Sequence, residues 1–102
     1  LDGEVQHDDS LGFECVGRPG GVSVMTAGDG IAHAEQTPAQ NSGVLNGVQL
    51  WVALPDGARR GPAGFEHVPQ VPVAELPGGL VKTFAGTLAG VRSPATHHSP
   101  IL

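Results

Sequence analysis

The chain has 102 residues, of which 16 are glycine and 9 are proline, and its formal net charge at pH 7 is −5. The longest stretch without glycine or proline is residues 4–11, which is too short for an average helix of roughly 11 residues. This spacing excludes a helical bundle, a coiled coil and a transmembrane helix, which needs about 20 consecutive apolar residues. Because 39% of the residues are hydrophobic, the composition favours a turn-rich all-β protein over a disordered chain.

The charged residues and the single cysteine narrow the function classes further. Five Lys and Arg stand against ten Asp and Glu, which excludes a basic face for direct nucleic-acid binding. Most of the acidic residues lie in residues 1–35; we interpret them as a solvated surface, with a cation site as the alternative. Cys15 has no partner for an internal disulfide and is expected to be a small, buried apolar residue. The acidic start contains no signal peptide, so we expect a cytoplasmic protein without membrane contact.

Strands are predicted where β-branched and apolar residues alternate between turn signals. In the first half of the chain these predicted strands are residues 4–7, 13–16, 22–26, 31–36 and 48–54. The last of them is the strongest and is mostly apolar on both faces, so it should be central in a sheet or packed on both sides. Trp51 lies in this strand and is interpreted as a core residue, with a pocket wall as the alternative.

The amino-acid composition changes at Pro55, because five prolines fall within residues 55–79. This stretch predicts an extended connector with little regular structure. Strand-like patterns resume over residues 80–88 and 91–102. The sequence thus predicts one β unit over residues 1–54 and a second that starts at residue 80. The chain begins with Leu1 and its single methionine is Met25, so we expect a fragment of a longer protein.

His33 and Glu35 are the strongest candidates for chemistry. They are two residues apart in a predicted strand, so their side chains should lie on one face. Imidazole and carboxylate together suit a divalent transition metal, and such donors with open positions suit non-haem Fe(II). The spacing alone is common, however, and by itself favours a half-exposed polar strand.

The other histidines are weaker candidates. His7 is interpreted as a surface residue at a hairpin end; a pocket residue, an acid or base, or a substitute ligand are the alternatives. His67 should be solvated in the connector. His97 and His98 are adjacent, so on a strand they would point to opposite faces and could not bind one metal. Phosphate-binding loop and nucleophilic-triad signatures are absent from the sequence.

Three stretches of the chain resemble the pirin family, which belongs to the cupin superfamily. They are residues 1–10 (LDGEVQHDDS), 25–35 (MTAGDGIAHAE) and 46–55 (NGVQLWVALP). Residues 73–77 (VAELP) and 99–102 (SPIL) resemble the crossing segment and the opening of a second cupin unit. The resemblance implies an incomplete cupin-like jelly-roll sandwich: residues 1–54 are the second part of an N-terminal cupin unit, 55–79 the connector and 80–102 the start of a C-terminal unit.

The resemblance also implies a metal site. Family members bind one metal, usually iron, through three histidines and one glutamate of the N-terminal unit. The third histidine and the glutamate match His33 and Glu35, whereas the first two come from a His-x-His segment that would precede Leu1. We therefore expect half of the ligand set here, with His7, Met25 and Trp51 as candidate pocket residues.

The implied function is that of an iron-dependent oxygenase of the quercetin 2,3-dioxygenase type, with a flavonol or another small aromatic substrate. Fe(II) is the expected cofactor, and another divalent metal is the alternative. A non-catalytic, iron-dependent regulator with a protein partner is the alternative function, and a chain that binds no metal by itself is a third hypothesis.

Overall fold

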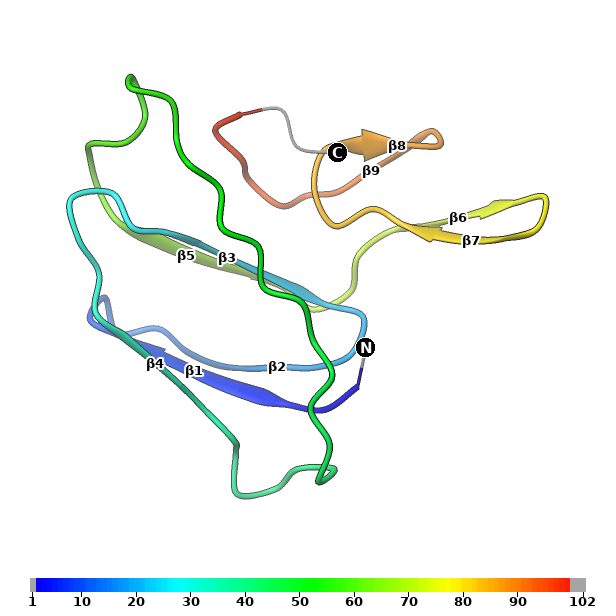
Figure 1. The fold of residues 1–102 in the computed structure, drawn as a ribbon. Coiled ribbons are helices and arrows are strands. Elements are labelled where there is room, and N and C mark those ends of the chain that lie inside the picture. The colour runs from blue at the N-terminus through cyan, green and yellow to red at the C-terminus, as the bar shows by residue number, and fades with distance from the viewer. Residues whose placement is uncertain (1, 100–102) are drawn as a thin grey trace.

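The structure, a computed structural model, describes residues 2–99. Within this range every regular element is a strand (Figure 1), which confirms the all-β prediction. The described residues contain no helix that is long and apolar enough to cross a membrane. The strands are β1 (Val5–Asp9), β2 (Glu14–Gly17), β3 (Val22–Thr26), β4 (His33–Gln36), β5 (Gly64–Val68), β6 (Val73–Leu76), β7 (Gly79–Lys82), β8 (Thr87–Leu88) and β9 (Val91–Arg92).

The first layer is a three-stranded antiparallel sheet in the order β2-β1-β4. In its register His7 on β1 lies between Cys15 on β2 and Glu35 on β4, and Asp9 lies opposite His33. Cross-strand partners share a face of the sheet, and so do residues two apart on one strand. The register therefore gathers these five side chains on one face.

The second layer is the antiparallel pair β3–β5, in which Met25 lies opposite Phe65. The Phe65 ring stacks on His7 of the first sheet with 3.8 Å between ring centroids, so this face of β3–β5 packs against β1. Residues 37–63 connect the two layers without a strand. They are tied to the start of β1 by two backbone hydrogen bonds between Asp2 and Asn46, of 3.0 and 2.7 Å.

The remaining strands form two hairpins, β6–β7 and β8–β9, which lie to one side of the molecule (Figure 1). A small core of Val68, Val71 and Ala95 joins them to the partly buried Val22 and Val24 of β3. The molecule is a slab of 43 × 39 × 17 Å with a radius of gyration of 14.7 Å, against about 13 Å for a compact domain of this length. Much of its apolar surface is consequently exposed.

Two predictions about the middle of the chain are wrong. Residues 48–54 form no strand, and Trp51 is 91% exposed instead of being a core residue. A strand needs a neighbouring strand for its backbone hydrogen bonds, and the ladders among the described residues do not include this segment. Residues 55–79 are in turn more regular than predicted, because β5 and β6 lie within them.

The strands predicted at the C-terminal end are only partly present. The pattern over residues 80–88 corresponds to β7 and β8, which a turn separates, and the pattern from Val91 onward yields only the short β9. Residues 100–102, which carry most of the predicted opening of a second cupin unit, lie outside the described residues. The division into a unit over 1–54, a connector and a second unit stays a prediction.

Candidate functional site

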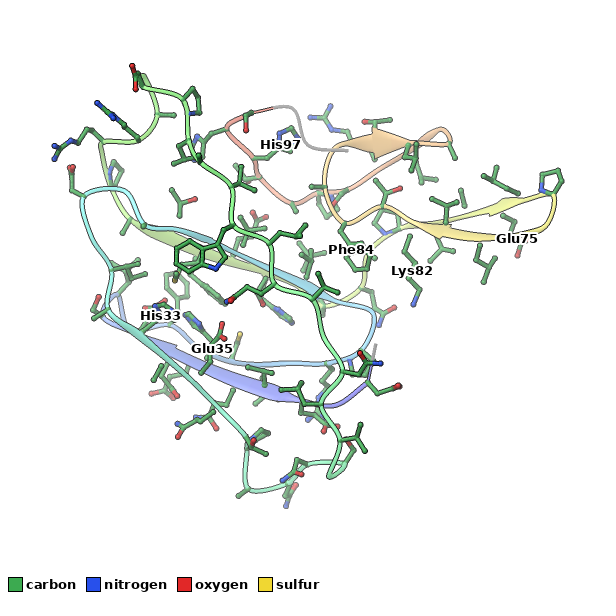
Figure 2. The ribbon with its side chains drawn as sticks, in the orientation of Figure 1. His33, Glu35, Glu75, Lys82, Phe84 and His97 are labelled. Atoms are coloured by element: carbon green, nitrogen blue, oxygen red, sulfur yellow. The ribbon has the colours of Figure 1, made fainter. Side chains whose placement is uncertain are left out.

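The candidate site is a block of four side chains on β1 and β4, namely His7, Asp9, His33 and Glu35. His7 lies opposite Glu35 and Asp9 lies opposite His33 in the antiparallel register. His33 and Glu35 project from β4 on the side of the β3–β5 pair (Figure 2). Because each strand contributes residues i and i+2, one face presents two imidazoles and two carboxylates side by side.

The β1 half of this block is buried and internally hydrogen-bonded. His7 is 5% exposed and its Nε2 lies 2.9 Å from Oδ2 of Asp9, whose side chain has no exposed surface. The other oxygen of Asp9 accepts the backbone N–H groups of Leu11 and Phe13, at 2.8 and 3.2 Å. The interpretation of His7 as a surface residue is therefore wrong. The turn over residues 9–13 folds back and covers the end of β1 that carries Asp9.

The hydrogen bonds also fix the charge of Asp9. Burial raises the pKa of this carboxyl, but the hydrogen bonds from His7, Phe13 and Leu11 together outweigh that effect, and the pKa lies below its ordinary value of 3.8. Asp9 is thus ionised at neutral pH, and an ionised carboxylate can only accept hydrogen bonds. Nε2 of His7 must therefore carry the hydrogen that it donates to Asp9.

Three aromatic rings form a stack through the block. The His7 ring lies against Phe65 with 3.8 Å between centroids and 9° between planes. The His33 ring is a second neighbour of His7, with 5.8 Å between centroids and 20° between planes. Phe13 leans on Phe65 at 6.0 Å, tilted by 46°. The stack runs from the second layer, through the buried His7, to the exposed His33 of β4.

His33 and Glu35 fit a divalent transition metal in kind, since an imidazole and a carboxylate on one strand face are suitable donors. Both side chains are exposed and so accessible to a metal ion. Among residues 2–99 there is, however, no group of three or more histidine, cysteine or acidic side chains placed to hold one. His7 does not complete the set, because its Nε2 is bound to Asp9. The described residues thus supply two donors of a larger set.

The other predicted site residues lie apart from this pair. Met25 is 37% exposed on β3, and Trp51 is exposed in the segment between β4 and β5. Neither of them lines a cavity of about 320 Å³ among the described residues, and nor does His7. That cavity lies against the β3–β5 pair and the C-terminal segment, and its polar lining includes Thr26, Glu66, Thr96 and His98. The pocket role of His7, Met25 and Trp51 stays a prediction.

The remaining histidines also differ from expectation. His67 lies on β5, where its Nδ1 is 3.0 Å from the Ser23 hydroxyl, instead of in an irregular connector. His97 and His98 are exposed and lie outside the strands, so the predicted strand edge is absent there.

Cys15 lies beside His7 in the sheet but is not poised to react. Burial, followed by the negative charges of Asp8 and Asp9, raises the pKa of its thiol. The thiolate is the form that binds metals and attacks electrophiles. Cys15 therefore remains a protonated, partly buried thiol at neutral pH. This is similar to the small, buried apolar role that the sequence predicts for it.

Sequence reasoning missed Asp9 and Phe65 as parts of this block. Asp9 follows His7 by two residues, which is the same spacing that singled out His33 and Glu35, so the strand period could have indicated it. Phe65 is 58 positions from His7 in the sequence, and no local pattern indicates that their rings meet.

Comparison with known proteins now identifies the family. The family model described as "Pirin" matches residues 1–52. The chain belongs to the pirin family. A Pseudomonas aeruginosa protein named "Putative quercetin 2,3-dioxygenase" is 42% identical over the whole chain, which spans 32% of that relative. A "Pirin-like protein" of Caulobacter vibrioides is 39% identical over 92% of the chain and 35% of the relative.

A solved structure confirms the cupin-like fold of this pirin chain. The crystal structure of quercetin 2,3-dioxygenase from Acinetobacter baumannii matches 98% of the chain with a TM-score of 0.85 at 36% identity, and the chain covers 33% of that protein. The chain therefore spans about a third of the length of the pirin relatives that it matches.

Proposed function

We propose that this pirin chain contributes His33 and Glu35 as two ligands of a divalent metal site, with Fe(II) as the metal and another divalent transition metal as the alternative. One observation carries the proposal: an accessible imidazole and an accessible carboxylate share one face of β4. The remaining ligands would come from a part of the protein outside the described residues or from a second copy of the chain.

The reaction we propose is the oxygenation of a flavonol such as quercetin. It is supported by the names of the Pseudomonas and Acinetobacter relatives, at 42% and 36% identity. A bound metal would supply Lewis-acid and redox chemistry. The chain itself would hold the metal at one Nε2 or Nδ1 atom and one carboxylate, and the stacked Phe65 and His7 rings would form an aromatic surface beside His33.

A non-catalytic role is the second candidate. It is favoured by the exposed apolar side chains of Val48, Leu50 and Trp51, which are 71%, 76% and 91% exposed and could contact a protein. In that role the metal would alter a surface that binds a regulatory protein, and there would be no small-molecule substrate.

Metal retention by the chain tests the ligand assignment. The wild-type chain, His33→Ala and Glu35→Gln are dialysed anaerobically against Fe(II), and retained iron is measured per chain. Matched controls are His97→Ala and Glu75→Gln, which remove the same residue types at positions away from His33 and Glu35 (Figure 2). We expect each site variant to bind iron about tenfold more weakly or worse, and the controls to bind like the wild type.

Equal retention by site and control variants would overturn the assignment. No retention by the wild-type chain would overturn the version in which a second copy of the chain supplies the remaining ligands. Quercetin absorbance, followed in air with the iron-loaded chain, separates the two functions. Loss of quercetin that depends on His33 supports the oxygenase. Retained iron without quercetin loss supports the regulator.

A further inference from the structure

The His7 ring occupies a position that the metal proposal leaves unexplained. It is buried, it is not available as a ligand through Nε2, and its ring pairs with those of both Phe65 and His33. A buried histidine costs the free energy of removing its polar atoms from water unless each is satisfied. The ring pairs that His7 makes with Phe65 and His33 therefore call for a role of His7 in the site.

Asp9 holds this ring in one orientation. Its carboxylate accepts the His7 Nε2–H and is itself held by the N–H groups of Leu11 and Phe13. A side chain tied at its tip and packed on a second ring has little rotational freedom. His7 is in this way a fixed plane inside the sandwich.

His33 in contrast lies on a strand whose residues are all exposed, and its ring is free to rotate unless something restricts it. Its ring pairs with that of His7, with 5.8 Å between centroids and 20° between planes. Such offset stacking between rings is favourable. Restricting a ligand before the metal arrives reduces the entropy lost on binding.

We propose that His7, tied down by Asp9 and backed by Phe65, is a positioning residue that holds the His33 imidazole in its ligating orientation. This inference rests on the proposed metal site for its purpose, but the ring contact itself exists without metal. His7 does not touch the metal. It acts by presenting an aromatic plane to His33.

The test uses two variants that differ only in that plane. His7→Leu fills the space without a ring, whereas His7→Phe keeps a ring; both lose the hydrogen bond to Asp9, so their stabilities are comparable. His67→Ala is the control, because it removes a partly buried histidine of the same sandwich that lies outside the stack. If neither His7 variant folds, Asp9→Asn, which weakens the tie without changing size, replaces them.

The first readout is the NMR signal of the His33 ring protons in the metal-free chain. A proton above an aromatic face is shifted upfield, so we expect His7→Leu to move the His33 signals downfield. His7→Phe and His67→Ala should leave these signals at their wild-type positions. Asp9→Asn should broaden or shift the His33 signals. The second readout is Fe(II) affinity. We expect about a tenfold loss for His7→Leu and recovery of most of it in His7→Phe.

The two readouts separate the failures. His33 signals that do not change in His7→Leu would overturn the positioning role, whatever happens to the metal. If His33→Ala abolishes iron binding but His7→Leu and His7→Phe bind iron equally, the metal site stands and the positioning role falls. If the wild-type chain binds no iron by itself, the ring-proton signals alone decide whether His7 orients His33.

Discussion

The junction between the start of β1 and the segment after β4 depends on a glycine. Gly3 has a φ of +94°, and a Cβ at this position would collide with the carbonyl oxygen of Val44. A positive φ costs an L residue about 1 kcal/mol. The collision can be relieved only by moving Val44, which breaks the two hydrogen bonds between Asp2 and Asn46 at about 1 kcal/mol each. We therefore expect Gly3→Ala to lower the free energy of unfolding by about 3 kcal/mol.

Gly12 provides the matched control, because its φ is +87° but a Cβ there would meet no atom within 4 Å. Gly12→Ala should cost only the backbone part, about 1 kcal/mol. Urea unfolding followed by circular dichroism measures both variants, and equal m-values would show that the unfolded states are comparable. Equal losses of stability in the two variants would refute the reasoning, since they would show that the close approach of Val44 to Gly3 contributes nothing.

Three further outcomes are expected from single side chains. The backbone N–H and then the hydroxyl of Ser42, together with Arg18, lower the pKa of Glu4 from its ordinary 4.5 against the opposing effect of burial. Glu4→Gln should thus reduce stability at pH 7, and its difference from wild type should vanish in urea titrations as the pH falls from 4.5 through the folded-state pKa; a constant difference would contradict this. The buried hydroxyl of Thr83 has no hydrogen-bond partner among the described residues. Thr83→Val should therefore raise the free energy of unfolding by about 1 kcal/mol, which is measured as a higher urea midpoint. A lower midpoint would show that the hydroxyl forms a hydrogen bond. Trp51→Ser should change the stability of this chain by less than about 0.5 kcal/mol, because the side chain is 91% exposed; a large loss would place the indole in a contact.

Local chemistry accounts for what the sequence predicted well. Residues 22–26 alternate in polarity between turn signals, and β3 has these bounds. The turn before it needs a residue that tolerates a positive φ, and Gly20 adopts +94° there. His33 and Glu35 share a face because they are two apart on β4, whatever surrounds them. Strand period and turn preference act over a few residues, so a single sequence contains them.

The buried half of the site depends on contacts that no short window contains. His7 is polar and lies next to Asp8 and Asp9, so its neighbours predict a surface position. Its burial results from Phe65, which reaches it from another layer, and from the turn that brings Leu11 and Phe13 onto Asp9. The free energy that buries the histidine thus comes from hydrogen bonds and packing that exist only after the two layers have met.

The failed prediction over residues 48–54 has a related cause and leads further. Alternation of apolar residues indicates surface that requires a partner, and the pattern does not say where the partner lies. Val48, Leu50 and Trp51 are 71%, 76% and 91% exposed, so neither face of the segment packs against other described residues. Burying a Val or Leu side chain contributes about 1.5–3 kcal/mol, and this chain forgoes that contribution at several positions. This chain spans about a third of the pirins that it matches. The exposed apolar segment and the small number of donors in the proposed metal site therefore share one explanation. We expect the residues that would cover the apolar segment, and the missing metal ligands, in a longer chain or a second copy. Adding that part should both bury the segment and complete the ligand set.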